Sequence, residues 1–265
     1  MAADDSNAPR PVTADGKFNP VVFGPCFTDR APTATLSSCP QQPDEQPPAF
    51  NGRGLWTSGL VSPDLAGTPA GSLPKSVQVK LADTIAPGRY PYVCLLHPFR
   101  GGAVDVMERE TQVPSPAQVS QAAEAAQAEA VTDATALGEP QAVAAGGETA
   151  VNAGWGDNVT AINQFGPAKV TVPAGTTVTW TSRSLYEPFT ITFGQPPFTS
   201  QDDPAMLVPG GVAPGGRYRS GFAYSGFIGP APFPTDTYSL TFTKPGIYDY
   251  VCLLHPGMTG TVEVT

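Results

Sequence analysis

Two short segments of the chain carry side chains that can bind a metal ion, at the same spacing. Residues 90–98 read Tyr-Pro-Tyr-Val-Cys-Leu-Leu-His-Pro, and residues 248–256 differ from them only by an Asp at the second position. The later segment continues to Met258, which gives Cys-x-x-His-x-x-Met, whereas the earlier one has Arg100 at the methionine position. Thiolate, imidazole and thioether groups are soft donors, and such donors suit copper. The repeated spacing therefore predicts a metal-binding loop.

The two segments differ in what they can bind. The later one offers three donors, Cys252, His255 and Met258. The earlier one offers Cys94 and His97, and Arg100 cannot complete the set because a guanidinium is always charged and accepts nothing. The chain has two histidines in total, one in each segment. We therefore expect at most one copper site, at the later segment, and a retained loop without metal at the earlier one. A site shared between the two histidines across an interface would restore a second imidazole, but no other feature favours it.

The elements around the later segment are expected to be strands. Apolar and polar residues alternate in short runs that are separated by turns containing Pro and Gly, a pattern typical of a sheet with one buried face. These runs are 168–172, 176–180, 189–193, 238–243, 247–252 and 261–264. Their number and spacing predict an all-β Greek-key sandwich over residues 151–265.

A helix is expected between the two halves of the chain. Ser115 is a good N-cap, Pro116 suits the first helical position, and Ala, Gln and Glu dominate residues 117–137 before Gly138. Its apolar face is thin, so we expect it to lie against one domain as a spacer. Together with a Gly/Ala-rich linker it forms the predicted connection over residues 114–150.

The first domain, residues 1–113, is harder to interpret. Residues 55–63 resemble residues 222–230, so the repeat extends upstream of the loop. Residues 18–23 match either the strand near 165–170 or the one near 189–193. Under either alignment this domain is expected to be incomplete at its N-terminal end.

Composition excludes several classes of partner. Lys and Arg number 14 against 23 Asp and Glu, a net charge of −9, whereas binding to nucleic acid or an anionic membrane needs a basic surface. No apolar run is long enough to cross a bilayer. Oligomeric state is not predicted.

The other two cysteines bear on the compartment. Cys26 and Cys39 lie in a Pro/Ser/Thr-rich stretch without a nearby histidine, so they form a disulfide or are two unrelated thiols. A disulfide implies an oxidising compartment. The first seven residues are acidic and lack the apolar core of a signal peptide, so the chain is cytoplasmic or is read after removal of its export signal. We expect an exported, periplasmic or extracellular protein.

From Ile162 to Thr265 the sequence resembles the cupredoxins, the plastocyanin- and azurin-like blue copper proteins. The resemblance rests on the run Phe-Gly-Pro-Ala-Lys-Val-Thr-Val-Pro-Ala-Gly-Thr-Thr-Val-Thr-Trp at 165–180 and on the turn, strand and loop over 244–258. The short ligand loop looks most like that of amicyanin. The earlier half shares the loop and the strand before it. The implied fold is two cupredoxin-like Greek-key β-sandwich domains in tandem, joined by the Ala-rich helix.

The resemblance implies an electron-transfer site in which one cysteine and two histidines hold copper, with a weak axial methionine. Carried over by position, Cys252 is the thiolate, His255 the C-terminal imidazole and Met258 the axial ligand. The other histidine of the family lies in a Pro-His-Thr context, where this chain has Phe189. Phe189 therefore marks a lost ligand position, and Glu187 or water could supply an oxygen in its place.

Three functions follow from this interpretation, and none is enzymatic. One is a blue-copper electron carrier, which needs a redox partner protein. Another is storage or delivery of Cu(I) through Cys252, His255 and Met258. The last is a metal-free interaction module that uses the aromatic connection 194–236. Catalytic copper centres would need more histidines than the chain has, a Cys-His nucleophile would need an oxyanion hole, and structural zinc would need four ligands.

Overall fold

The computed structural model describes ten stretches of the chain. They are residues 8–11, 13–29, 32–39, 48–61, 74–97, 100–140, 148–157, 159–198, 203–231 and 233–265. Parts of the sequence interpretation lie outside the described residues. They are the acidic N-terminus 1–7, residues 62–63 of the stretch 55–63, Pro98 of the first loop, residues 141–147 of the expected linker, and residues 199–202 and 232 of the aromatic connection.

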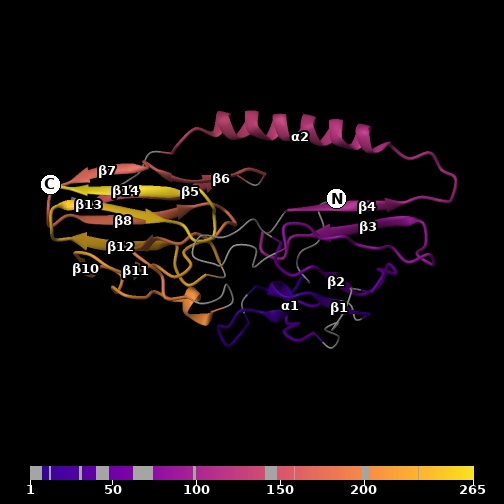
Figure 1. Cartoon of the computed structure of the whole chain (residues 1–265), viewed down its shortest axis with the longest axis horizontal. Helices are drawn as coiled ribbons and strands as arrows, with labels where there is room; N and C mark the ends of the chain where they lie inside the picture. The colour runs from indigo at the N-terminus through magenta and orange to yellow at the C-terminus, as the bar shows by residue number, and fades with distance from the viewer. Residues whose placement is uncertain are drawn as a thin grey trace. The chain divides into compact units, whose positions relative to one another are not determined.

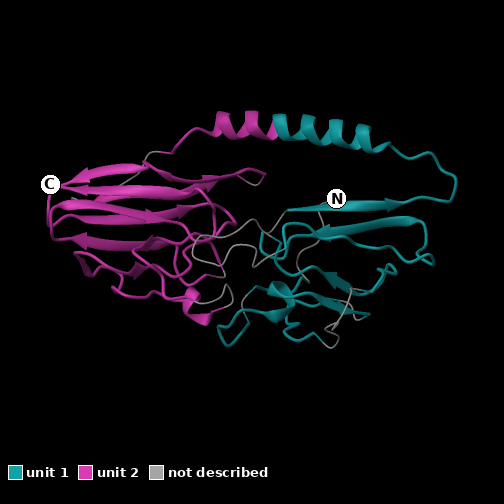
Figure 2. Ribbon diagram, in the orientation of Figure 1, with its two compact units in different colours: residues 1–63, 73–128 teal, residues 64–72, 129–265 magenta. Residues whose placement is uncertain are grey.

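The chain divides into two compact units (Figure 2). Unit 1 comprises residues 1–63 and 73–128, and unit 2 comprises residues 64–72 and 129–265. The finer boundaries expected from the sequence, at residues 113 and 150, stay a prediction. The architecture is mostly β-structure with one long helix, as the sequence predicts (Figure 1).

Unit 2 is a sandwich of two five-stranded sheets. Its elements are β5 (Thr149–Gly156), β6 (Ala161–Gly166), β7 (Lys169–Val172), β8 (Thr177–Arg183), β9 (Thr192–Phe193), η2 (Pro204–Leu207), β10 (Arg217–Tyr218), β11 (Ala223–Tyr224), β12 (Thr237–Phe242), β13 (Gly246–Val251) and β14 (Thr259–Val264). The first sheet has the order β10-β12-β8-β5-β6, and the second has the order β11-β9-β13-β14-β7. The pairs β5–β8, β7–β14 and β10–β12 are parallel, and the other strand pairs of the two sheets are antiparallel.

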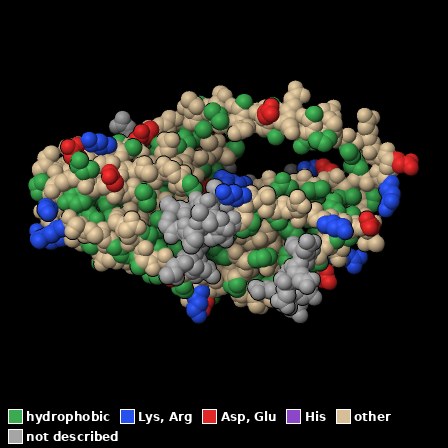
Figure 3. Space-filling model, in the orientation of Figure 1, with side chains coloured by type: hydrophobic (Ala, Val, Ile, Leu, Met, Phe, Trp, Pro, Cys, Tyr) green, Lys and Arg blue, Asp and Glu red, His purple; other side chains and the backbone are tan. Residues whose placement is uncertain are grey.

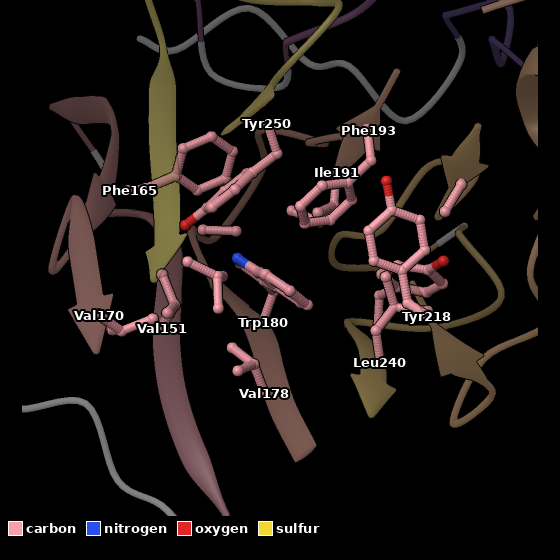
Figure 4. Packing of buried hydrophobic residues seen from close by; sticks show 14 of the residues in the cluster. Val151, Phe165, Val170, Val178, Trp180, Ile191, Phe193, Tyr218, Leu240 and Tyr250 are labelled. Carbon is pink, nitrogen blue, oxygen red and sulfur yellow. The ribbon is translucent and has the colours of Figure 1, made fainter. Parts of the chain in front are cut away.

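The core of the sandwich is aromatic. Trp180 of β8 is fully buried and lies edge-on to Tyr250 of β13, with ring centroids 5.2 Å apart. Figure 4 shows Trp180 beside Val151 and Val178, facing Phe165 and Tyr250. Alternation places these side chains inside because successive residues of a strand point to opposite faces. Burial of these large side chains is the main stabilising contribution to unit 2, at about 25 cal/mol per Å² of apolar surface.

Two parts of unit 2 differ from expectation. Strand β5 lies inside the first sheet between β8 and the edge strand β6, although its first residues were expected to be linker and no strand was expected in the rest. A bulge at Gly154, with φ of 69°, interrupts its alternation. The expected strand 189–193 is ladder-paired only at Thr192–Phe193, and Phe189 forms an isolated bridge with Ile228.

Unit 1 has less regular structure in its described residues. Its elements are α1 (Pro20–Phe23), β1 (Cys26–Thr28), β2 (Leu55–Thr57), β3 (Gly88–Val93) and β4 (Gly101–Val106). Strands β1 and β2 form one antiparallel pair, and β3 and β4 form another. Cys26 and Cys39 are joined by a disulfide with Cα atoms 5.6 Å apart.

Residues 18–23 are not a strand, so both alignments considered for them are wrong. Asn19 accepts a hydrogen bond from the main-chain N–H of Val21 and starts the short helix α1 at Pro20. The same device recurs in unit 2, where Asp203 accepts from the N–H of Ala205 at the start of η2. An Asx side chain followed by Pro favours a helical turn over a strand.

Helix α2 (Pro116–Leu137) joins the two halves of the sequence. It begins as expected, because Ser115 Oγ accepts from the N–H of Gln118 while the Gln118 side chain accepts from the N–H of Ser115, and Gly138 follows it with φ of 60°. However, none of its residues is buried. The expectation that α2 lies against a domain is therefore wrong.

No helix among the described residues is long and apolar enough to cross a membrane. On the face drawn in Figure 3, the Lys and Arg side chains of the described residues are scattered among Asp and Glu.

Candidate metal centre

The loop between β13 and β14 is shaped by its own main chain. The N–H of Cys252 donates to the carbonyl of Met258 at 3.0 Å, and the N–H of Met258 donates to the carbonyl of His255 at 3.1 Å. These two bonds close a tight turn directly after the last ladder pair, Val251 with Thr259. Main-chain hydrogen bonds therefore place Cys252, His255 and Met258 on one tight turn.

The thiol and the imidazole of this loop face each other. Cys252 Sγ lies 3.4 Å from Nδ1 of His255, and Cys252 is only 1% exposed. Two donors at this separation can share one metal ion, because metal bonds to nitrogen and sulfur are roughly 2.0 and 2.3 Å long. The Cys–His pair therefore fits copper, with Nδ1 as the coordinating nitrogen.

Thr190 supports the sulfur from the other side. Its N–H and its hydroxyl donate to Cys252 Sγ at 3.4 and 3.8 Å, and its hydroxyl oxygen accepts from the N–H of Leu253 at 2.7 Å. Burial by itself raises the pKa of Cys252, but the hydrogen bond and charge of His255, with main-chain donors including Thr190, lower it overall. The site therefore favours the thiolate, which is the form that binds metal.

Phe189 occupies the position expected for the lost ligand. Its side chain is fully buried, and its ring centroid lies 5.0 Å from that of the His255 imidazole. A Cβ added at Gly154 would overlap the Phe189 ring at Cζ, so the bulge of β5 makes room for this ring. A benzene ring at this place excludes both an imidazole and a water molecule from that side of the thiolate.

A buried carboxylate faces the other nitrogen of the imidazole. Glu187 is 1% exposed, and its Oε2 lies 3.5 Å from Nε2 of His255, an ion-pair distance. Burial by itself lowers the pKa of His255, but the hydrogen bonds and charges of Cys252 and Glu187 outweigh it and raise the pKa to about 9. The carboxylate is thus on the side of the ring opposite the sulfur, and a metal ion held by Nδ1 and Cys252 cannot also take an oxygen from Glu187.

Met258, the third soft donor expected from the sequence, is buried near the Cys252–His255 pair. It is 2% exposed and belongs to the same buried apolar cluster as Cys252 and Phe189. Within the described ranges, no group of three or more His, Cys, Asp and Glu side chains could hold a metal ion. A site here therefore depends on the thioether as its third ligand, as the sequence spacing implies.

The earlier loop makes the same two main-chain hydrogen bonds but has different side-chain contacts. The N–H of Cys94 donates to the carbonyl of Arg100 at 2.7 Å, and the N–H of Arg100 donates to that of His97 at 3.2 Å. Cys94 Sγ is 3.2 Å from Nδ1 of His97, and a guanidinium nitrogen of Arg100 is 3.4 Å from the same Nδ1. Since guanidinium only donates, it takes the lone pair that a metal would need.

The surroundings of the two loops also differ. Tyr92 packs over Gly102 as Tyr250 packs over Gly260, because an added Cβ at either glycine would strike the tyrosine ring. Yet Tyr92 is 61% exposed and Tyr250 is 1% exposed. Cys94 is only partly buried, whereas Cys252 lies in the core. The earlier loop thus makes the same main-chain hydrogen bonds as the later one, but no buried core among the described residues excludes water from it.

Sequence reasoning did not identify the role of three residues. Glu187 was considered only as an oxygen ligand, Thr190 only as part of the Pro-Phe-Thr context, and Gly154 not at all. A charged residue directly before a buried aromatic segment was the available signal for Glu187. The glycine gave none, because its partner Phe189 is far away in the sequence.

The fold of unit 2 and the loop after its penultimate strand together define a cupredoxin-like β-sandwich. Sequence comparison agrees with this class. The chain is 31% identical over 101 residues to Amicyanin-alpha of Methylorubrum extorquens, which is 38% of this chain and 64% of that protein. The chain thus spans a little under two thirds of the relative. No family model matches the sequence.

Solved structures of amicyanin variants are also similar. A Cu(I) form superposes with a TM-score of 0.30 at 26% identity and covers 46% of this chain and 86% of the variant. An oxidised form gives a TM-score of 0.30 at 27% identity with the same coverage. Superpositions at this level add nothing to the assignment of the fold, which the two sheets of unit 2 define directly.

Proposed function

We propose that unit 2 is a copper-binding domain that holds Cu(I) through Cys252, His255 and Met258. The observation that carries the proposal is the 3.4 Å separation of Cys252 Sγ and His255 Nδ1 in a buried loop that two main-chain hydrogen bonds close. When bound, copper would supply one-electron redox chemistry. The sulfur and imidazole donors of this chain hold it and exclude water from it.

Phe189 makes Cu(I) the favoured oxidation state. Cu(I) is well served by soft donors in low coordination number, whereas Cu(II) prefers an added nitrogen or oxygen ligand. The Phe189 ring fills the place of the added ligand and has no donor atom, and Glu187 lies on the side of the imidazole away from Cys252. Neither residue can therefore supply the ligand that Cu(II) prefers. Storage or delivery of Cu(I) is therefore better supported than cycling between both states.

Two other functions each have one supporting observation. The similarity to amicyanin favours an electron carrier, which would need a redox partner protein. The membership of Phe189, Cys252 and Met258 in one apolar cluster favours a metal-free module, because free cysteine and methionine pack well among aromatic rings. In neither case is an enzymatic role proposed.

Copper titration of the full chain separates these functions. Under anaerobic conditions, Cu(I) is titrated against a chromophoric competitor. We expect one equivalent to bind, with binding lost in Cys252→Ala and retained in Cys94→Ala, the matched control in the loop that Arg100 occupies. Binding that is retained in Cys252→Ala would place the ion elsewhere, and loss in both variants would show that Cys252 alone does not hold it. No uptake by the native chain would leave the metal-free module.

Addition of Cu(II) tests the electron carrier. An intense visible band from a thiolate–Cu(II) bond in the native chain would favour reversible redox cycling despite Phe189. We expect no such band, or one that fades as the thiolate reduces the ion.

The remaining features of the sequence extend the proposal. Unit 1 is proposed as a degenerate copy of the cupredoxin-like domain, because its loop repeats both main-chain bonds of the second loop. Export to an oxidising compartment is proposed from the Cys26–Cys39 disulfide, since such bonds are rare in the cytosol.

A further inference from the structure

Glu187 is a buried carboxylate held at a fixed place. It lies in the segment that follows β8, where its main-chain N–H donates to Ser184 Oγ at 2.9 Å and the N–H of Tyr186 donates to the same oxygen at 3.3 Å. The side chain is 1% exposed. Removing an ionised carboxylate from water costs several kcal/mol, so it is tolerated only beside a partner. The partner at this place is the imidazole of His255, at 3.5 Å.

The two nitrogens of His255 have separate neighbours. Nδ1 faces Cys252 Sγ at 3.4 Å, and Nε2 faces Glu187 Oε2 at 3.5 Å. Turning the ring over would move Nδ1 towards the carboxylate and would remove the donor N–H from it. A carboxylate that attracts the proton to one ring nitrogen leaves the other nitrogen for a metal.

The other face of the ring is also constrained. Phe189 packs against the imidazole, and the main chain of Phe189 is tied to Ile228 by a pair of hydrogen bonds at 2.8 and 2.9 Å. The imidazole is thus held by the sulfur of its own loop and by a carboxylate and an aromatic ring from the segment that follows β8. Only 14% of its side chain is exposed.

We propose that Glu187 is the positioning residue of the metal loop: it binds Nε2–H of His255 and so holds Nδ1 towards Cys252 before any metal arrives. This inference rests on the proposed copper-binding function for its consequence, but the orientation itself is a property of the metal-free protein. Glu187 takes the role that an outer carboxylate has behind a metal-bound histidine, where its loss costs 10- to 100-fold in metal affinity.

The test compares the ring N–H signals of His255 with those of His97, which serves as an internal reference in the full chain. The protein is labelled with ¹⁵N, and the ring N–H signals of His97 and His255 are recorded without metal. We expect a slowly exchanging Nε2–H signal from His255 that disappears in Glu187→Ala, with the His97 signals unchanged. Glu263→Gln is the matched control, because that carboxylate belongs to the same unit but pairs with Lys169 at the surface.

Metal affinity is the second readout. With the same competitor as above, we expect Cu(I) affinity to fall between about 10- and 100-fold in Glu187→Ala and not in Glu263→Gln. Glu187→Gln keeps the side-chain volume and an acceptor oxygen, so this variant should lose less Cu(I) affinity than Glu187→Ala. Glu187→Gln also replaces Glu187→Ala in both measurements if the alanine variant does not fold. Native-like His255 signals and an affinity within twofold of the native chain in both Glu187 variants would overturn the proposal.

The two readouts separate this inference from the proposed function. If the His255 signal changes in Glu187→Ala while the native chain binds no Cu(I), Glu187 positions the ring but unit 2 is not a copper domain. If copper binds equally well to native and variant chains with unchanged ring signals, the copper function stands and the positioning role is wrong.

Discussion

Replacing Phe189 by His should lower the stability of the metal-free protein and allow it to bind Cu(II). The contacts of Phe189 give the size of the stability loss. The Phe189 ring is fully buried between Gly154 of the first sheet and the His255 ring. An imidazole there loses apolar contact where Cζ meets Gly154, and it leaves a ring nitrogen without a partner. A buried unsatisfied polar group costs about 1–3 kcal/mol. With the lost packing we expect the metal-free Phe189→His variant to be destabilised by roughly 3 kcal/mol.

Copper should reverse most of this loss. The added imidazole would complete the family's set of one cysteine and two histidines, so Cu(II) should bind with strong thiolate colour. Binding at 100 times the dissociation constant stabilises a folded protein by about 2.7 kcal/mol. Thermal unfolding with and without Cu(II) measures both effects. At roughly 2–4 °C per kcal/mol, the melting temperature should fall by about 10 °C without metal and recover nearly fully with it.

A control variant separates ligand gain from ring loss. Phe189→Leu also removes the ring but supplies no donor, so it should lose stability in the same range and gain nothing from copper. A Phe189→His variant that is as stable as the native chain without metal, and stays colourless with Cu(II), would refute the placement of Phe189 at the ligand position.

Three further predictions follow from contacts around the loop. Gly154→Ala should lower the free energy of unfolding in denaturant by roughly 2–4 kcal/mol, because the added Cβ would overlap the Phe189 ring and a φ of 69° strains an L-residue. An unchanged unfolding midpoint would show that the bulge tolerates a side chain. Cys94 should react with a disulfide reagent at least tenfold faster than Cys252 in the folded, metal-free chain, because Cys94 is only partly buried and Cys252 is buried, whereas the pKa of both thiols is lowered. Equal rates would contradict the different burial of the two thiols. The pKa of His255 is raised from 6.5 to about 9, so the stability that its protonation contributes is fully present below about pH 6.5 and is lost as the pH rises through 9. The difference in unfolding free energy between the native chain and His255→Phe should therefore shrink from pH 7 to 10. A constant difference would contradict the raised pKa.

The strands that alternate cleanly were predictable because a half-buried strand needs that pattern. Strand β12 (Thr237–Phe242) and strand β14 (Thr259–Val264) lie where the sequence predicts them, with every second residue buried. Strand β5 was not predictable, since a bulge shifts its register between Ala153 and Trp155 and Gly and Ala dominate it. Its place in the sheet is decided by pairing with β8, which is not visible in local composition.

The candidate site was predictable only where its residues are neighbours in the chain. Cys252, His255 and Met258 share one turn, so spacing alone indicates that they face one another. Glu187 lies on a different segment from His255, and the contact between them depends on how the two sheets pack. Pair contacts across a sandwich therefore need the structure, even where the family resemblance names the ligands.

The paired main-chain bonds of the two loops have a consequence for how such a chain can change. In both loops the turn is set by the N–H of a cysteine and by the carbonyl of the residue six positions later, so side chains at that later position do not enter the bonding. Arg100 and Met258 sit on the same backbone frame with opposite effects on a cation. A single substitution there can thus convert a metal ligand into a positive charge, or the reverse, without refolding the loop. The side chain at this one position therefore decides whether the turn can bind a cation. Exchanging the two loops between the units would test this directly.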